Sequence, residues 1–135
     1  MIPLEATEVY PESELLPLSD LFFTAPILSM EFYSKLREEI RSCGHMHHPL
    51  VVFRATGAEW NKLQGGQDGA LDRAPNPDQL YTCVSCGNNR GRVAKELGYT
   101  HVSCLVVDSF KTGSEYCKQM RNWYARKQGK RIRGG

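Results

Sequence analysis

The pattern of apolar and polar positions predicts two amphipathic helices in this chain. Ser29 is a candidate N-cap residue, and the apolar residues after it recur every three or four positions as far as Gly44, a residue type that often ends helices. This pattern predicts a surface helix over residues 29–43. Near the other end of the chain, residues 113–128 place aromatic side chains and methionine on one stripe and basic residues on the other, which predicts a second helix.

Three short runs between these helices predict strands: a β-branched run at 49–54, which is expected to be buried, and further strands at 80–86 and 101–108. A glycine-containing turn over 87–91 follows the second strand, and a short helix over 90–97 leads to the third. This order is typical of a βαβ-like unit and favours an α+β (α/β-like) fold over an all-helical or all-β one. We therefore expect a small mixed sheet flanked by helices.

The length of 135 residues fits a single domain with a core of its own. Residues 1–14 are polar and acidic and are interpreted as a lead-in arm. The domain is expected over 15–128, beginning with an edge strand at 15–21, and a basic tail follows at 129–135. Residues 55–79 contain four glycines and two prolines, which predicts a loop insertion.

One helical turn is expected inside the insertion, at residues 58–63, with Trp60 and Leu63 as its anchors to the core. No run approaches the ~18 apolar residues that span a bilayer, so no membrane partner is expected. The first residues lack the basic start and apolar core of a signal peptide, which favours a cytoplasmic protein.

The net charge of +2 conceals an asymmetry along the chain. Residues 1–34 carry six acidic side chains and no lysine or arginine, whereas residues 111–135 carry eight basic side chains and one acidic one. A basic tail of this kind is either solvated or in contact with a polyanion such as DNA. The candidate nucleic-acid contacts are Lys127, Lys130, Arg131 and Arg133.

Five cysteines include the pair Cys83 and Cys86, which has the spacing of a metal knuckle. Both residues fall in a predicted strand, where positions three apart point to opposite faces of the sheet. No second pair at knuckle spacing accompanies them. We therefore expect small buried side chains here, and no zinc site.

The turn after the second strand carries the clearest chemical signal in the sequence. A glycine permits a sharp turn and the close approach of a ligand, and the first N–H groups of the following helix are unpaired and partly positive. A phosphate is a natural occupant of such a turn, and arginine can grip it with two hydrogen bonds. The alternative is a capped turn with solvated arginines. The candidate phosphate-binding residues are Gly87, Asn88, Asn89, Arg90 and Arg92.

The order of these segments resembles the N-terminal domain of the ParB/sulfiredoxin superfamily. The resemblance rests on Gly44, His48-Pro49-Leu50-Val51-Val52, Tyr81 to Cys86, Gly87-Asn88-Asn89-Arg90-Gly91-Arg92-Val93-Ala94, Leu97-Gly98 and Val102 to Val107. It implies a ParB-like fold that binds CTP or ATP with Mg²⁺, with the phosphates on the Gly-x-x-Arg turn. Members of the family include DNA-segregation clamps, phosphotransferases and DNA nucleases.

The chain departs from the family pattern at several positions. Asn88 stands where the ParB turn has a carboxylate and where sulfiredoxin has its catalytic cysteine. Cys86 precedes the glycine, so a sulfinic-acid reductase is not expected. Asn122 and Arg126 are candidates for the second phosphate or metal contact that the family places on a later helix. We expect a stand-alone domain without the helix-turn-helix domain of ParB proteins.

Three further residues are candidate catalytic groups. His47 and His48 precede the first predicted strand, where the family has its nucleotide-facing loop, and either could contact a phosphate or act as a base near neutral pH. Solvent-exposed loop histidines are the alternative. Asp108 follows the last strand and either binds a metal or caps the next turn.

These observations leave three functions open. The first is nucleotide or phosphate binding at the Gly87–Arg92 turn, with or without phosphotransfer or hydrolysis. The second is DNA binding or nuclease activity that uses the same turn and the basic C-terminal helix. The third is an inactive regulatory module of the kind that phage and plasmid genomes encode. The oligomeric state stays open, with a homodimer among the options.

Overall fold

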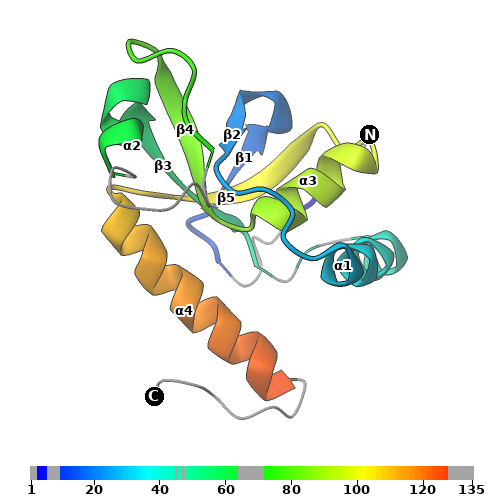
Figure 1. The fold of residues 1–135 in the computed structure, drawn as a ribbon. Helices are drawn as coiled ribbons and strands as arrows, with labels where there is room; N and C mark the ends of the chain where they lie inside the picture. The colour runs from blue at the N-terminus through cyan, green and yellow to red at the C-terminus, as the bar shows by residue number, and fades with distance from the viewer. Residues whose placement is uncertain (1–2, 6–9, 45, 47, 64–71, 128–135) are drawn as a thin grey trace.

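A computed structural model describes residues 3–5, 10–44, 46, 48–63 and 72–127. It confirms the predicted α+β class, because the described residues form one five-stranded mixed sheet with helices on both faces (Figure 1). In chain order the elements are β1 (Glu14–Pro17), the 3-10 helix η1 (Leu18–Asp20), β2 (Leu21–Phe23), α1 (Met30–Cys43), β3 (Leu50–Thr56), α2 (Gly57–Leu63), β4 (Leu80–Cys86), α3 (Asn88–Glu96), β5 (His101–Val107) and α4 (Phe110–Lys127).

The strands lie in the order β1-β5-β3-β4-β2. β1 is antiparallel to β5, β5 is parallel to β3, β3 is antiparallel to β4, and β4 is parallel to β2. The βαβ-like interpretation of β4, α3 and β5 is therefore wrong. β3 lies between the two strands, parallel to one and antiparallel to the other, so α3 connects antiparallel strands that are not neighbours.

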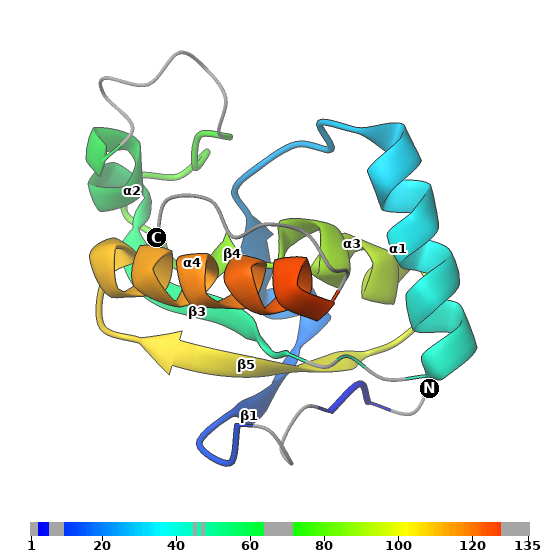
Figure 2. The same ribbon diagram turned by 90° about the horizontal axis from the view of Figure 1, so that it is seen from below.

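The helices divide into two pairs. α3 packs on β2 and β3, and α1 packs mainly against α3. α4 and α2 lie on the other face, where α4 crosses β3 and β4 (Figure 2). Each pair of helices therefore covers its own apolar cluster on the sheet. One cluster includes Tyr33, Leu50 and Val93, and the other includes Phe53 and Trp60.

Local signals place the helix ends close to the predicted ones. The Ser29 hydroxyl accepts the main-chain N–H of Phe32 at 3.2 Å, and Gly44 ends α1 in the left-handed region with φ +73°. α3 starts at Asn88, two residues before the predicted start. α4 starts three residues before its predicted start, because the Ser109 hydroxyl accepts the N–H of Thr112 and caps the helix there.

The segment expected as one edge strand at 15–21 forms two strands at opposite edges of the sheet. β1 ends at Pro17, η1 turns the chain, and β2 then pairs with β4. The acidic arm also takes part in the fold. Leu4 is fully buried and pairs with β5, donating its N–H to the His101 carbonyl at 3.3 Å and accepting the Ser103 N–H at 2.9 Å.

The insertion is attached to the domain through α2 and the segment that returns to β4. Trp60 is only 1% exposed, and its indole N–H donates to the Asp72 carbonyl at 2.8 Å. The Asn61 amide makes two hydrogen bonds to the main chain of Ala74. The predicted anchor at Trp60 is confirmed, whereas Leu63 is 52% exposed and does not anchor the insertion.

No helix among the described residues combines the length and the apolar character that crossing a bilayer requires.

Candidate functional site

The turn between β4 and α3 depends on Gly87. Its φ of +99° is disfavoured for residues with a side chain, and a Cβ here would lie 2.8 Å from Arg90 Nη2 and 3.0 Å from Leu50 Cγ. Gly87 occupies the N-cap position of α3 and provides no side-chain hydrogen bond to the helix. The first main-chain N–H groups of α3 therefore have no side-chain cap.

Helical geometry separates side chains that were predicted from the sequence to form one site. Asn88 and Arg92 are four residues apart and lie on the same side of α3, whereas Arg90 lies about 200° around the helix from Asn88. Asn88 and Arg92 both contact residues 24–25, and Arg90 contacts residues 48–49 and α4. The predicted group of phosphate ligands is thus divided between two sides of one helix.

Asn88 fixes the chain after β2. Its Oδ1 accepts the main-chain N–H groups of Thr24 at 2.8 Å and Ala25 at 3.3 Å. Its Nδ2 lies 3.3 Å from both the Thr24 hydroxyl and the Val84 carbonyl. The expected hydrogen bond from this amide to a ligand is thus replaced by four bonds within the protein. An aspartate here could not donate the two hydrogen bonds that Nδ2 makes. These bonds explain in structural terms why asparagine fits this position.

Arg90 is 7% exposed and lies beneath the turn. Its Nη1 donates to the carbonyl oxygens of His48 at 2.6 Å and Pro49 at 3.1 Å, while Nη2 faces the sulfur atoms of Cys86 and Met120 at 3.9 and 3.7 Å. Arg90 was expected to bind an external phosphate, but in the structure its guanidinium donates hydrogen bonds to the main chain. Every one of these partners is uncharged, so no carboxylate among the described residues pairs with this guanidinium.

His48 lies beside Arg90 and is 2% exposed, which contradicts a solvent-exposed loop histidine. The Tyr10 hydroxyl lies 2.8 Å from His48 Nδ1, and the two rings meet edge to face. Burial raises the pKa of Tyr10, and the positive charge of Arg90 partly opposes that rise. The sequence interpretation missed Tyr10; a single aromatic residue in an otherwise polar, acidic arm was the available signal.

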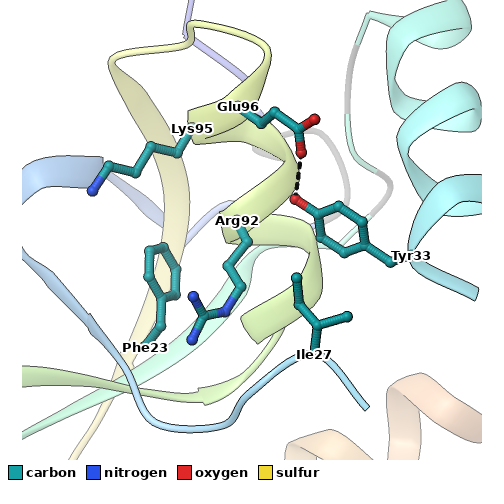
Figure 3. Close-up of a pocket in the computed structure, with 6 residues that line it drawn as sticks. All are labelled: Phe23, Ile27, Tyr33, Arg92, Lys95 and Glu96. Carbon is teal, nitrogen blue, oxygen red and sulfur yellow. Dashed lines mark hydrogen bonds between the residues drawn. The ribbon is translucent and has the colours of Figure 1, made fainter. Parts of the chain in front are cut away.

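Arg92 points away from the turn and into a pocket between α1 and α3. Its guanidinium carbon lies 5.2 Å from the centre of the Phe23 ring, and its Nη2 donates to the Ala25 carbonyl at 3.0 Å. Asp72 Oδ2 is 3.8 Å from the same nitrogen. The cavity measures about 330 Å³, and we call it the α1–α3 pocket (Figure 3). It is lined by Phe23, Ile27, Tyr33, Arg92, Lys95 and Glu96.

A hydrogen-bonded carboxylate closes one side of the α1–α3 pocket. The Tyr33 hydroxyl donates to Glu96 Oε2 and Arg37 Nη1 donates to Glu96 Oε1, both at 2.7 Å (Figure 3 shows the first). These two bonds lower the pKa of Glu96. Burial, followed by the hydrogen bond to Glu96, raises the pKa of Tyr33 to about 12. The network therefore links α1 to α3 with the Glu96 carboxylate ionised and the Tyr33 phenol neutral.

The replacement Tyr33→Phe is expected to raise the pKa of Glu96, because it removes the hydrogen bond that lowers that pKa most. A carboxyl with a lowered folded-state pKa contributes stability above its unfolded pKa and loses that contribution as the pH falls. The variant should accordingly lose less stability on acidification than the wild type does. Carboxyl ¹³C NMR titration measures the pKa, with Glu115 on α4 as the internal control; an unchanged Glu96 pKa would contradict the network.

Asp108 does not join the turn. The sheet register pairs Val51 with Cys86 and Phe53 with Val107, so Asp108 lies about four residues along the strand direction from Gly87, roughly 13 Å. Its Oδ1 accepts the hydroxyl of Thr112 at 2.9 Å, at the start of α4. This contact fits the turn-capping alternative.

The remaining predicted residues are placed only in part. Asn122 lies half-buried on α4, two residues beyond the Met120 that faces Arg90. Arg126 and Lys127 are in the same helix, but their side chains lie outside the described part of the chain. His47, Lys130, Arg131 and Arg133 also lie outside it. The DNA-binding interpretation of the tail thus stays a prediction from the sequence.

The cysteine pair occupies β4 as expected. Cys83 is fully buried in the cluster beneath α2 and α4, where burial raises the pKa of its thiol to about 11. Cys86 is half-buried and faces Arg90. Among the described residues no three His, Cys, Asp or Glu side chains converge in a way that could hold a metal ion.

Comparison with known proteins found no family model that matches the chain and no curated protein with a similar sequence. The resemblance to the ParB/sulfiredoxin superfamily therefore stays a prediction.

Proposed function

We propose that this protein binds the phosphate group of a nucleotide at the N-terminus of α3. The observation that carries the proposal is the buried guanidinium of Arg90, which has only uncharged partners among the described residues and lies directly beneath an uncapped helix start. A buried positive charge without a carboxylate favours an anion nearby.

The proposed phosphate contacts are main-chain groups rather than the side chains named from the sequence. The N–H groups of Asn88, Asn89 and Arg90 belong to the first turn of α3, where the helix dipole adds partial positive charge. Gly87 leaves this turn without a Cβ. Arg90 provides charge from below and fixes residues 48–49, which brings His48 and Tyr10 to the same region.

CTP or ATP with Mg²⁺ is the ligand that the sequence resemblance suggests. Mg²⁺ binds nucleotides mainly through their phosphate oxygens and keeps several waters, so it needs few protein ligands. The described residues provide no three-residue cluster for this ion, and Asn88 replaces a carboxylate at the turn. The proposal is therefore one of binding, and we assign no hydrolytic step.

The replacement Asn89→Asp separates binding from folding. A carboxylate in the first turn interacts favourably with the helix dipole, by about 0.3–1 kcal/mol, but repels a phosphate at the same place. We therefore expect an unliganded melting temperature at or above that of the wild type, together with roughly tenfold weaker binding of CTP or ATP in the presence of Mg²⁺. Thermal shift and isothermal titration calorimetry measure both quantities.

The matched control is Gln79→Glu, which adds the same charge at an exposed position just before the opposite end of β4. This variant should bind the nucleotide as the wild type does. Failure of millimolar CTP and ATP to raise the wild-type melting temperature would contradict the proposal. Equal affinities for wild type and Asn89→Asp would place the nucleotide elsewhere.

A further inference from the structure

We infer that the α1–α3 pocket is a second binding site, which takes a small monocarboxylate with an aromatic or branched apolar group. The inference goes beyond the proposed nucleotide site, because Arg92 and the pocket lie on the opposite side of α3 from Arg90. A volume of about 330 Å³ is at the lower end of the range for ligand pockets. It suits a ring with one acidic group better than a nucleoside triphosphate.

Arg92 is held in place before any ligand arrives. Its guanidinium carbon lies over the Phe23 ring, and Nη2 donates to the Ala25 carbonyl. Its Nε is buried and has no hydrogen-bond partner among the described residues, but the side chain is 28% exposed, and a guanidinium has five N–H donors. A guanidinium immobilised in this way loses little conformational entropy when it binds an anion.

The charge balance around the pocket selects a single negative charge. Lys95 lines the pocket from the next turn of α3, and its side chain extends toward the Phe23 side, away from Tyr33 (Figure 3). No salt bridge within the described residues engages it. Glu96 is already matched by Arg37 at 2.7 Å, and Asp72 lies 3.8 Å from Arg92. Three of these groups are cations and two are anions. One positive charge is therefore in excess, and one carboxylate would balance it.

The apolar part of the ligand has a matching wall. Phe23 and Ile27 come from β2 and the segment that follows it, and Tyr33 comes from α1. Phe23 lies on one side of the Arg92 side chain, and Ile27 and the Tyr33 ring lie on the other (Figure 3). The Tyr33 hydroxyl is engaged by Glu96, so this side chain presents mainly its ring to the cavity. An aromatic or branched group can therefore pack beside the Arg92 side chain while its carboxylate meets that guanidinium, with the positive charge of Lys95 at the Phe23 side of the pocket.

Titration of ¹⁵N-labelled protein with phenylacetate tests the inference, with phenylacetamide as the uncharged isostere. We expect chemical-shift changes concentrated at residues 23–33 and 92–96, and roughly tenfold weaker binding of the amide. Lys95→Gln should weaken phenylacetate binding by a similar factor. Lys118→Gln, at an exposed position of α4 across the sheet, is the matched control and should leave the affinity unchanged.

Three results would each overturn the inference: equal affinity for the acid and the amide, equal affinity for wild type and Lys95→Gln, or shifts centred on residues 87–90. The last result would assign the carboxylate to the start of α3. Asn89→Asp should leave phenylacetate binding intact, so failure of the nucleotide proposal and failure of this inference remain distinguishable.

Discussion

Replacing Arg90 with methionine is expected to lower the free energy of unfolding by about 3 kcal/mol. The guanidinium is 7% exposed and bridges the carbonyl oxygens of His48 and Pro49. Methionine fills similar space but donates no hydrogen bond, so two carbonyl groups lose their charged donor in a region from which water is largely excluded. Part of that loss is offset because the variant no longer buries a charge.

Urea denaturation measures this effect, and Arg37→Met is its matched control. Arg37 forms its ion pair with Glu96 near the surface, where the side chain is 36% exposed, so its loss should cost at most about 1 kcal/mol. A similar cost for the two variants would contradict the structural role of Arg90. Because Arg90 supports the fold, its variants cannot serve alone as probes of ligand binding.

Replacing Trp60 with alanine is expected to cost about 3–5 kcal/mol, the usual range for a large buried aromatic side chain. Trp60 is 1% exposed, and its ring centre lies 5.9 Å from that of Phe53 and 6.0 Å from that of Phe110. Its indole N–H also holds the Asp72 carbonyl. The substitution should therefore create a cavity between β3 and α4 and loosen residues 72–79, the segment that leads from the insertion to β4.

Leu63→Ala, on the same short helix, is the matched control. Leu63 is 52% exposed, so its truncation should change stability by no more than about 0.5 kcal/mol. Hydrogen exchange should show faster exchange at residues 72–79 in the Trp60 variant. A loss below about 1 kcal/mol for Trp60→Ala, with unchanged exchange there, would contradict the assignment of this segment to the folded domain.

Features with local causes could be predicted from the sequence. The cap at Ser29 and the left-handed Gly44 bound α1, and a short, mostly apolar run between turn-forming segments predicted the limits of β4 at Leu80 and Cys86. The importance of Gly87 also followed from local chemistry, because only a glycine readily takes the required φ. The opposite directions of Asn88 and Arg90 were implicit in their spacing on a helix, although their partners were not.

Features that depend on distant contacts could not be predicted. β1 and β2 are separated by only three residues but pair with different strands, and nothing in their own sequence specifies those partners. Asn88 and Arg90 are likewise committed to residues 64 and 42 positions away. Strand order and the use of a polar side chain within the protein are set by tertiary packing, which a local pattern does not encode.

The most direct measurement of the central claim is a crystal structure of the protein soaked with CTP or ATP and Mg²⁺. We expect phosphate oxygens about 3 Å from the main-chain nitrogens at the start of α3, with Arg90 still bonded to residues 48–49. A nucleotide bound elsewhere, or a vacant turn at saturating nucleotide, would contradict the claim.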